Sequence, residues 1–367
     1  MRAAQGIYGG AVVLALVAAT LLDRGALALT TTTRAGSILM FPKVVCAPGR
    51  DTVIQLTNTG NMTNDLRCFY LDGDTCSETD FDISLTRLQP TVWGVCAGRP
   101  VSPTDAQHGL DPGKIPPLPV GSAGALVCAE VAPGGDVPMA RNQVTGEATL
   151  VGAGLTGSAT SVSKYNAIAL PGGSDMDQTL KLDDKEYSAC PAAQLLDFPA
   201  DGSNQTIDAL GGTTGAETVT TRVTLVPCVL DFENFTPTAG VMKFDRWDEE
   251  ELHLSSSRPF SCWDSFALGP YVNPLAGSFG TVQMVGVDRD ASPSQAVPVV
   301  AVAETFYTDG NGHVTSAAVN LHGAGRCKLP SGELDLRVCT RDADCGVPAI
   351  LGSCVTNAEG RMTLATP

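Results

Sequence analysis

Residues 53–58 read VIQLTN and residues 223–228 read VTLVPC, and each short apolar run predicts a buried β-strand. The surrounding sequence follows one pattern in both halves. A leucine in the run is followed 29 residues later by another leucine, then by a proline five residues on and a tryptophan three or four residues after that. These positions are Leu56, Leu85, Pro90 and Trp93 in the first half, and Leu225, Leu254, Pro259 and Trp263 in the second. The shared spacing indicates that the chain repeats one unit.

Three further features recur in the same order. They are GSAGALVCAEV at 121–131 and GSFGTVQMVGV at 277–287, a Val-Pro pair at Val137-Pro138 and Val297-Pro298, and a closing β-like segment, VSKYNAIALPG at 162–172 and VTSAAVNLHG at 314–323. Chance similarity is the alternative, because strand-rich segments share composition. The matched order favours duplication, and we predict two tandem domains of one architecture, residues 36–172 and 217–326.

Both halves consist of short apolar runs separated by turn signals. Asp72-Gly73 and Asp309-Gly310 are typical of hairpin turns, and no amphipathic helical pattern is convincing. These features predict an all-β fold of two tandem antiparallel β-sandwich domains. The run DTVIQLTNTGN at 51–61, followed by a cysteine-bearing strand, resembles immunoglobulin-like domains of exported bacterial proteins. The resemblance implies a central strand and turn there, an immunoglobulin-like fold, and no particular activity.

Two segments lie outside the proposed domains. Residues 173–216 are rich in Gly, Asp and Thr and read as a linker or insertion, although CPAAQLLDF at 190–198 is apolar enough to dock onto a domain with one short helix. Residues 327–367 form a Cys-rich C-terminal segment whose CTRDADC run at 339–345 is similar to small motifs of secreted proteins from environmental bacteria. A segment this short cannot bury its own core, so disulfides are expected to stabilise it.

The N-terminus has the three parts of a secretory signal. Arg2 is basic, residues 10–22 are an apolar stretch too short to span a bilayer, and Ala26 and Ala28 place small residues before a cleavage site. We predict a signal peptide over residues 1–28, with an uncleaved anchor as the alternative, and no transmembrane span in the mature chain. The protein is therefore expected to be secreted or on the cell surface, with the periplasm as a second location.

All cysteines follow the predicted cleavage site, and their even number in an exported chain favours disulfides over zinc, since no CxxC occurs. The disulfide candidates are Cys46, Cys68, Cys76, Cys96, Cys128, Cys190, Cys228, Cys262, Cys327, Cys339, Cys345 and Cys354. The sequence leaves their pairing open.

The net charge is −16, so phosphate repulsion argues against nucleic acid as a partner. A protein or cell-surface partner is compatible with this charge.

Catalytic motifs are absent from the sequence. There is no GxSxG, HExxH, Walker A or Rossmann glycine pattern. Ser161 to Lys164 fits SxxK, but this pattern lies in a predicted strand, whereas the family that uses it places its serine at the start of a helix, and no SDN or KTG companion is present. We predict no catalytic residue and no cofactor.

Calcium is the one ligand that the acidic residues suggest, because it takes oxygen ligands. The candidates are Asp72, Asp74, Asp80, Asp288 and Asp290. Aspartate is also the ordinary turn residue, and the turn interpretation is favoured. The run Asp245 to His253 likewise reads as a solvated turn between two strands. Trp93 and Trp263, at equivalent positions, are interpreted as packing residues that the fold repeats.

Three functions compete. The first is a non-catalytic cell-surface or extracellular protein with a structural or adhesive binding role. The second is an exported hydrolase with an unrecognised site, and the third is a periplasmic binding or assembly factor, for which an exposed edge strand would be the sign. We rank them in that order.

Overall fold

The computed structural model describes residues 31–100, 113–135, 137–153, 160–173, 180–201, 218–234, 236–272, 279–289, 295–310, 314–331, 334–339, 342–345 and 353–363. Within these ranges every element is a strand except one short helix, α1 (Gly269–Val272), and a turn of 3-10 helix at Asp342–Cys345. The predicted all-β class is confirmed. The predicted signal peptide lies outside the described residues.

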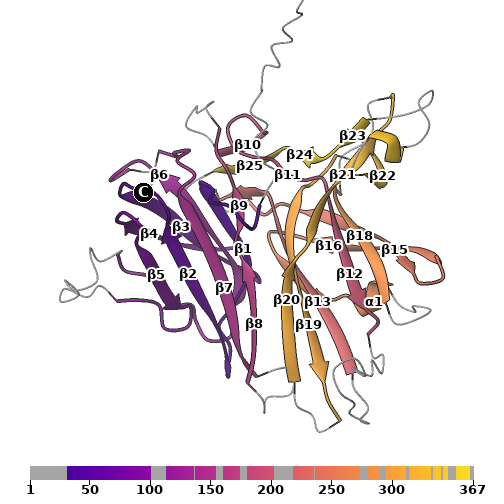
Figure 1. Ribbon diagram of the computed structural model, residues 1–367, viewed down its shortest axis with the longest axis horizontal. Coiled ribbons are helices and arrows are strands. Elements are labelled where there is room, and N and C mark those ends of the chain that lie inside the picture. Colours follow the sequence, from indigo (N-terminus) through magenta and orange to yellow (C-terminus); the bar gives the residue numbers. More distant parts are fainter. Residues whose placement is uncertain are drawn as a thin grey trace, which may run out of the picture.

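The first half of the chain forms two antiparallel sheets (Figure 1). The five-stranded sheet has the order β4 (Glu78–Leu85), β3 (Asn64–Asp72), β6 (Ala123–Val131), β1 (Ile38–Val45), β9 (Ile168–Leu170). The first four-stranded sheet has the order β5 (Pro90–Gly94), β2 (Arg50–Asn58), β7 (Val144–Ala153), β8 (Thr160–Asn166).

Strand β2 shows why the sequence pattern produces this arrangement. It buries every second residue, and Ile54 and Leu56 enter a first core between the two sheets. Trp93 of β5 joins that core, where its indole Nε1 donates to the Tyr70 hydroxyl at 2.6 Å. The predicted buried strand at 53–58 is therefore confirmed.

The second half also forms two sheets. The seven-stranded sheet follows the path β16 (His253–Phe260), β15 (Gly240–Asp248), β18 (Phe279–Asp288), β12 (Ala193–Pro199), β21 (His322–Lys328), β22 (Leu334–Cys339), with β23 (Ser353–Val355) also on β21. The second four-stranded sheet has the order β17 (Asp264–Ala267), β13 (Thr218–Pro227), β19 (Val299–Thr308), β20 (Val314–Asn320). A second core between them includes Leu225, Phe244 and Met284.

The strand orders of the two halves coincide. In chain order, β1 to β9 take the same places as β12, β13 and β15 to β21, and every pairing between them is antiparallel. The matched stretches 53–58 and 223–228 lie on β2 and β13, and those at 121–131 and 277–287 lie on β6 and β18. Strand β12 lies within the segment interpreted as a linker, and residues 190–199 form strands β11 and β12 rather than a short helix.

The sheets nevertheless do not separate clearly into two immunoglobulin-like sandwiches. The outer face of the five-stranded sheet is covered by a central core that includes Phe69, Val127, Tyr187, Val226 and Met362. Two small sheets cover it, with orders β10 (Leu180–Leu182), β25 (Gly360–Thr363), β14 (Val229–Asp231) and β11 (Cys190–Pro191), β24 (Asn357–Ala358). Because linker and tail strands share this core with both halves, the chain forms one body.

All twelve cysteines are paired, and none is free. The pairs are Cys46–Cys96, Cys68–Cys128, Cys76–Cys262, Cys190–Cys228, Cys327–Cys345 and Cys339–Cys354. The last two lie in the C-terminal segment, as its composition predicts. The disulfide Cys76–Cys262 connects the two halves.

Candidate functional site

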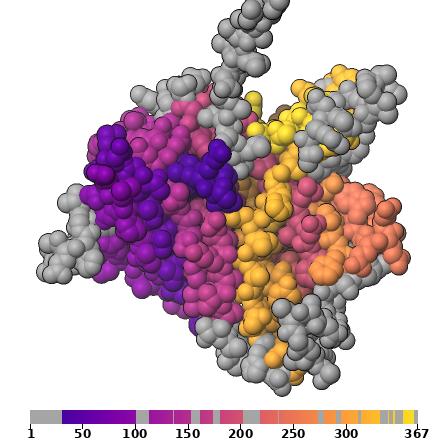
Figure 2. All heavy atoms as spheres, viewed as in Figure 1, coloured from indigo at the N-terminus to yellow at the C-terminus, as the bar shows by residue number. Residues whose placement is uncertain are grey.

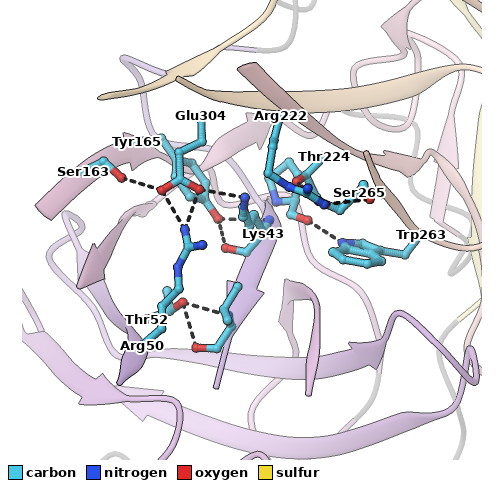
Figure 3. Close-up of polar contacts among 12 residues, drawn as sticks. Lys43, Arg50, Thr52, Ser163, Tyr165, Arg222, Thr224, Trp263, Ser265 and Glu304 are labelled. Carbon is cyan, nitrogen blue, oxygen red and sulfur yellow. Dashed lines mark hydrogen bonds and ion pairs between the residues drawn. The ribbon is translucent and has the colours of Figure 1, made fainter. Parts of the chain in front are cut away.

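The most polar buried region lies where the halves meet. Strand β8 of the first half contacts β20 of the second, and Figure 2 shows their magenta and orange surfaces in continuous contact on this face. Behind this seam, β1, β2 and β8 bring polar and charged side chains toward β19 (Figure 3). We call the group formed by Lys43, Arg50, Ser163 and Glu304 the seam cluster.

A β-bulge in β1 directs the first half toward the second. The register with β6 shifts between Phe41 and Val44, so Pro42 and Lys43 leave the regular ladder. The Pro42 carbonyl then accepts a hydrogen bond from Trp263 Nε1 at 2.8 Å, across the seam. The Tyr165 hydroxyl makes two hydrogen bonds to the backbone of Lys43. It accepts from the Lys43 N–H at 3.1 Å and donates to the Lys43 carbonyl.

Glu304 is the centre of the seam cluster, and its side chain is 1% exposed. One carboxylate oxygen accepts from Lys43 Nζ at 2.7 Å. Arg50 Nη2 donates to both oxygens at 2.6 and 2.5 Å, and the Ser163 hydroxyl donates at 3.2 Å. Each residue comes from a different strand, so the carboxylate connects β1, β2 and β8 to β19 (Figure 3).

Burial and charge act in opposite directions on these groups. Burial lowers the pKa of Lys43 to about 8, although attraction to Glu304 opposes the shift. Burial alone would raise the pKa of Glu304, but Lys43 and Arg50 outweigh it and hold that pKa below its ordinary value. Arg222 lies close enough to affect Lys43 as well. One buried carboxylate therefore offsets several cations, among which the Arg50 side chain is 20% exposed.

The Ser163 hydroxyl is held inside the seam cluster. Ser163 is buried, and its hydroxyl is committed to a carboxylate that already binds two cations. The SxxK residues next to it are separated: Ser161 donates to the Gly152 carbonyl at 2.8 Å, and Lys164 is half exposed and paired with Glu147. This geometry suits a fixed connection between the halves.

Trp263 lies at the end of the seam where the disulfide Cys76–Cys262 joins the two halves. Its ring packs on Gly73, where an added Cβ would come within 2.2 Å of the indole. Trp93 instead lies inside the first core. The prediction that the two tryptophans repeat one packing role is wrong, because Trp263 precedes β17 and faces the other half of the molecule.

The calcium candidates lie in different settings. Asp72 accepts the backbone N–H groups of Asp74 and Thr75 at 3.1 and 2.8 Å, as in an Asx turn. Asp80 pairs with Arg67, and Asp288 ends β18. Asp290 lies outside the described residues. Because the others have these separate settings, the candidates are not brought together in the part of the chain that is described. Calcium binding stays a prediction.

The acidic run at 245–253 is a solvated turn only in its middle. Residues 249–252 connect β15 to β16, whereas Asp245–Asp248 end β15 and Arg246 and Asp248 are buried. The Asp248 carboxylate accepts from the backbone of Glu250 and Leu252 at 3.0 and 2.8 Å. Within the described ranges, the one group with metal-ligand spacing is Cys327, Cys339 and Cys345, whose sulfurs are in disulfides.

Sequence reasoning missed the seam cluster. Its signal is a lone charge inside an apolar strand, Lys43 in ILMFPKVV and Glu304 in VVAVAETF. A charge at such a position has to be paired when it is buried. Lys43 and Glu304 would therefore have been a reasonable pair to predict.

Comparison with known proteins leaves the family open. No family model matches the chain, and no curated protein matches it. Among solved structures, Thermotoga maritima 1070 overlaps at TM-score 0.24 with 10% identity, over 37% of this chain and 95% of that chain. The PBSX exported protein XepA gives TM-score 0.17 and 9% identity over 68% and 82%. The CupB6 tip adhesin from Pseudomonas aeruginosa gives 0.14 and 9% over 80% and 92%. TM-scores this low carry no argument about fold or function.

Among the described residues, no helix is long and apolar enough to cross a membrane.

Proposed function

We propose that the chain is an exported, non-catalytic protein that acts at the cell surface or outside the cell as a structural or adhesive binding module, built from two related immunoglobulin-like sandwich units. The coinciding strand orders support the two units. Twelve paired cysteines support an oxidising compartment, because disulfides persist there and are rare in the cytosol.

The observation that carries the proposal is the double connection between the halves. Cys76–Cys262 joins them covalently, and the seam cluster joins them through a buried carboxylate. Domains connected by a small polar interface move relative to one another by default. These two connections, together with the central core that both halves share, fix the relative position of the outer surfaces, which favours a binding module whose surface spans both halves.

The first experiment locates the protein. The full-length gene is expressed in its host, the cells are fractionated, and the protein is analysed by mass spectrometry without reduction. We expect a mature chain that begins at Leu29, has no free thiol and is found on the surface or in the medium. An intact Met1 with free thiols in the cytoplasm would overturn the proposal.

The second experiment measures binding. Fluorescently labelled mature chain is added to intact host cells that lack the gene, and bound fluorescence is recorded against concentration. We expect saturable binding that weakens at least severalfold in the double variant Cys76→Ser/Cys262→Ser, because the two halves are then less firmly held. Release of product from cell-wall polymers in proportion to added protein would favour the hydrolase alternative instead.

A further inference from the structure

The disulfide Cys76–Cys262 differs from the other five in what it connects. Its cysteines are 186 residues apart in the chain, whereas the other pairs are 60 or fewer residues apart. Of the other five, two lie within the first half, one joins the segment interpreted as a linker to the second half, and two lie in the C-terminal segment. Opening Cys76–Cys262 is therefore the one covalent change that affects how the two halves are held.

Cys76 also has an unusual backbone. It lies in the turn between β3 and β4 with a backbone φ of 60°. Residues other than glycine and asparagine rarely adopt this left-handed conformation. Among the described residues it is the one cysteine with positive φ. Local strain of this kind persists only when surrounding structure enforces it, and it concentrates at functional positions.

The disulfide lies beside a groove. A small cavity of about 10 Å³ is lined by Cys76, Cys262 and Glu78. A larger groove of about 420 Å³ adjoins it, sharing Leu230, Asp231 and residues 236–238 as walls. Cys76 is itself partly exposed, while Cys262 is buried. An incoming thiol would thus meet Cys76 first.

A carboxyl group lies beside this route. Glu78 Oε2 is buried and has no hydrogen-bond partner among the described residues. Burial, together with repulsion from Asp80 on the same strand, raises the pKa of Glu78 to about 7, although Arg67 on β3 opposes the shift. Asp231 on β14 also lines the cavity. The Glu78 carboxyl is therefore able to give up a proton near neutral pH.

We propose that Cys76–Cys262 is a thiol–disulfide exchange site, opened by a dithiol that approaches from the groove lined by Leu230, Asp231 and residues 236–238 and attacks the sulfur of the partly exposed Cys76. A thiolate of the dithiol forms a mixed disulfide with Cys76 as the Cys76–Cys262 bond breaks. The departing Cys262 thiolate takes the proton of Glu78. The second thiol of the reagent then gives its proton to solvent and attacks the reagent's first sulfur, which closes the reagent's own disulfide and breaks its bond to Cys76. The released Cys76 thiolate and the Glu78 carboxylate each take up a proton from solvent. The protein disulfide is reduced to two thiols, and the dithiol is oxidised.

The test uses the oxidised mature chain and dithiothreitol as the dithiol. Samples are taken across a dithiothreitol series, free thiols are alkylated, and each cysteine is quantified by mass spectrometry. We expect Cys76 and Cys262 to react at least ten times faster than any other pair. Cys46–Cys96 is the internal control, because Cys96 is also partly exposed but has ordinary backbone geometry. Earlier opening of that pair, or of all six together with loss of near-ultraviolet circular dichroism, would overturn the proposal.

The variant Glu78→Gln tests the role of the carboxyl. The reduction rate of wild type divided by that of the variant is measured from pH 6 to pH 8. We expect this ratio to fall severalfold, because Glu78 changes from a proton donor to an anion that repels the incoming thiolate. The variant keeps the size of the side chain, so folding is unaffected by volume. A ratio that stays flat with pH would show that Glu78 has no part in the exchange.

Discussion

The two halves share a strand order but stabilise it by different chemistry. When the β3–β4 and β15–β16 ladders are aligned on their first paired residues, Cys68 coincides with Phe244. Cys68 forms a disulfide with Cys128 opposite it on β6, whereas Phe244 lies opposite Met284 on β18 and packs against other aromatic rings. The first half therefore has a disulfide at the position where the second half packs apolar side chains.

The same alignment reveals a second difference. Glu130 on β6 coincides with Gly286 on β18. The buried Glu130 carboxylate accepts three backbone N–H groups, from residues 141–143, and the Asn64 side-chain amide, all between 2.7 and 2.9 Å. At Gly286 an added Cβ would lie 2.2 Å from the Val297 carbonyl, so the following loop approaches the strand directly. A strand order thus constrains neither the polarity nor the size of its inner residues.

Phe244→Ala should have the largest effect. Removing a buried ring that contacts Phe266 and Tyr271 leaves a cavity, and we expect a loss of about 4–5 kcal/mol in unfolding free energy. Urea denaturation of the oxidised chain measures it. Phe279→Ala is the control, because Phe279 is 51% exposed and should change stability little. Equal losses in both variants would contradict the role of Phe244.

The double variant Cys68→Ala/Cys128→Ala tests the matched place in the first half. Opening a loop of this length is expected to reduce the unfolding free energy by about 4 kcal/mol, chiefly by freeing the unfolded chain. The same urea denaturation applies, with mass spectrometry to confirm five remaining disulfides. A loss below about 1 kcal/mol would show that packing alone holds these strands.

Glu304→Gln tests how far the halves depend on each other. Lys43 and Arg50 lose their buried counter-charge, and we expect a loss of about 3 kcal/mol. Because the pKa of Glu304 is held below its ordinary 4.5, its contribution is complete above that pH and is lost as pH falls through the folded pKa. The difference between wild type and variant should therefore shrink below about pH 4.

Lys164→Gln is the control for Glu304→Gln. Lys164 pairs with Glu147 on the exposed face of β8, and surface pairs contribute less than about 1 kcal/mol. A Glu304→Gln effect as small as this one would show that the seam cluster contributes little to the connection.

Glu130→Gln sharpens the comparison with Gly286. An amide nitrogen cannot accept, so at least one backbone N–H loses its buried partner, and we expect a loss of about 2–3 kcal/mol. Hydrogen exchange should show faster opening of residues 141–143, because the carboxylate fixes that loop. Unchanged exchange there would contradict this assignment.

Glu78→Gln should have the smallest effect, and its size depends on pH. Since the folded pKa is raised to about 7, the folded protein retains a proton that the unfolded chain loses above about pH 4.5. Ionisation therefore costs the wild type stability as pH rises from 4.5 through 7. The variant should match wild type at pH 4 and exceed it at pH 8 by less than about 1 kcal/mol, because Glu78 is only partly buried. Thermal unfolding at the two pH values measures it.

Local sequence patterns predicted the strands well. The runs at 53–58 and 223–228, the turn at 249–252 within the predicted run 245–253, and the disulfide-bearing tail follow from alternation, turn residues and cysteine content. The matched stretches also fall on matched strands, because buried strands in equal positions face similar packing requirements.

Long-range relations were harder to predict. Strand β12 lies at the centre of its sheet, yet its sequence, AQLLDFP, has a mixed pattern that favours neither helix nor strand. The pairing of Cys76 with Cys262 and the meeting of Lys43 with Glu304 depend on how two units pack, and local periodicity carries no information on that. The small strand β25, only four residues long, gives no signal by itself.

The position of β25 has a consequence for when the central core can form during synthesis. It lies between β10 and β14, pairs with both, and buries Met362 in the central core. That core therefore stays unfinished until residues 360–363 have been made, however well the earlier sheets have formed. A chain terminated before that point would expose apolar surface, which chaperones and proteases recognise. Strand β25 thus closes, late in the chain, a core to which both halves contribute.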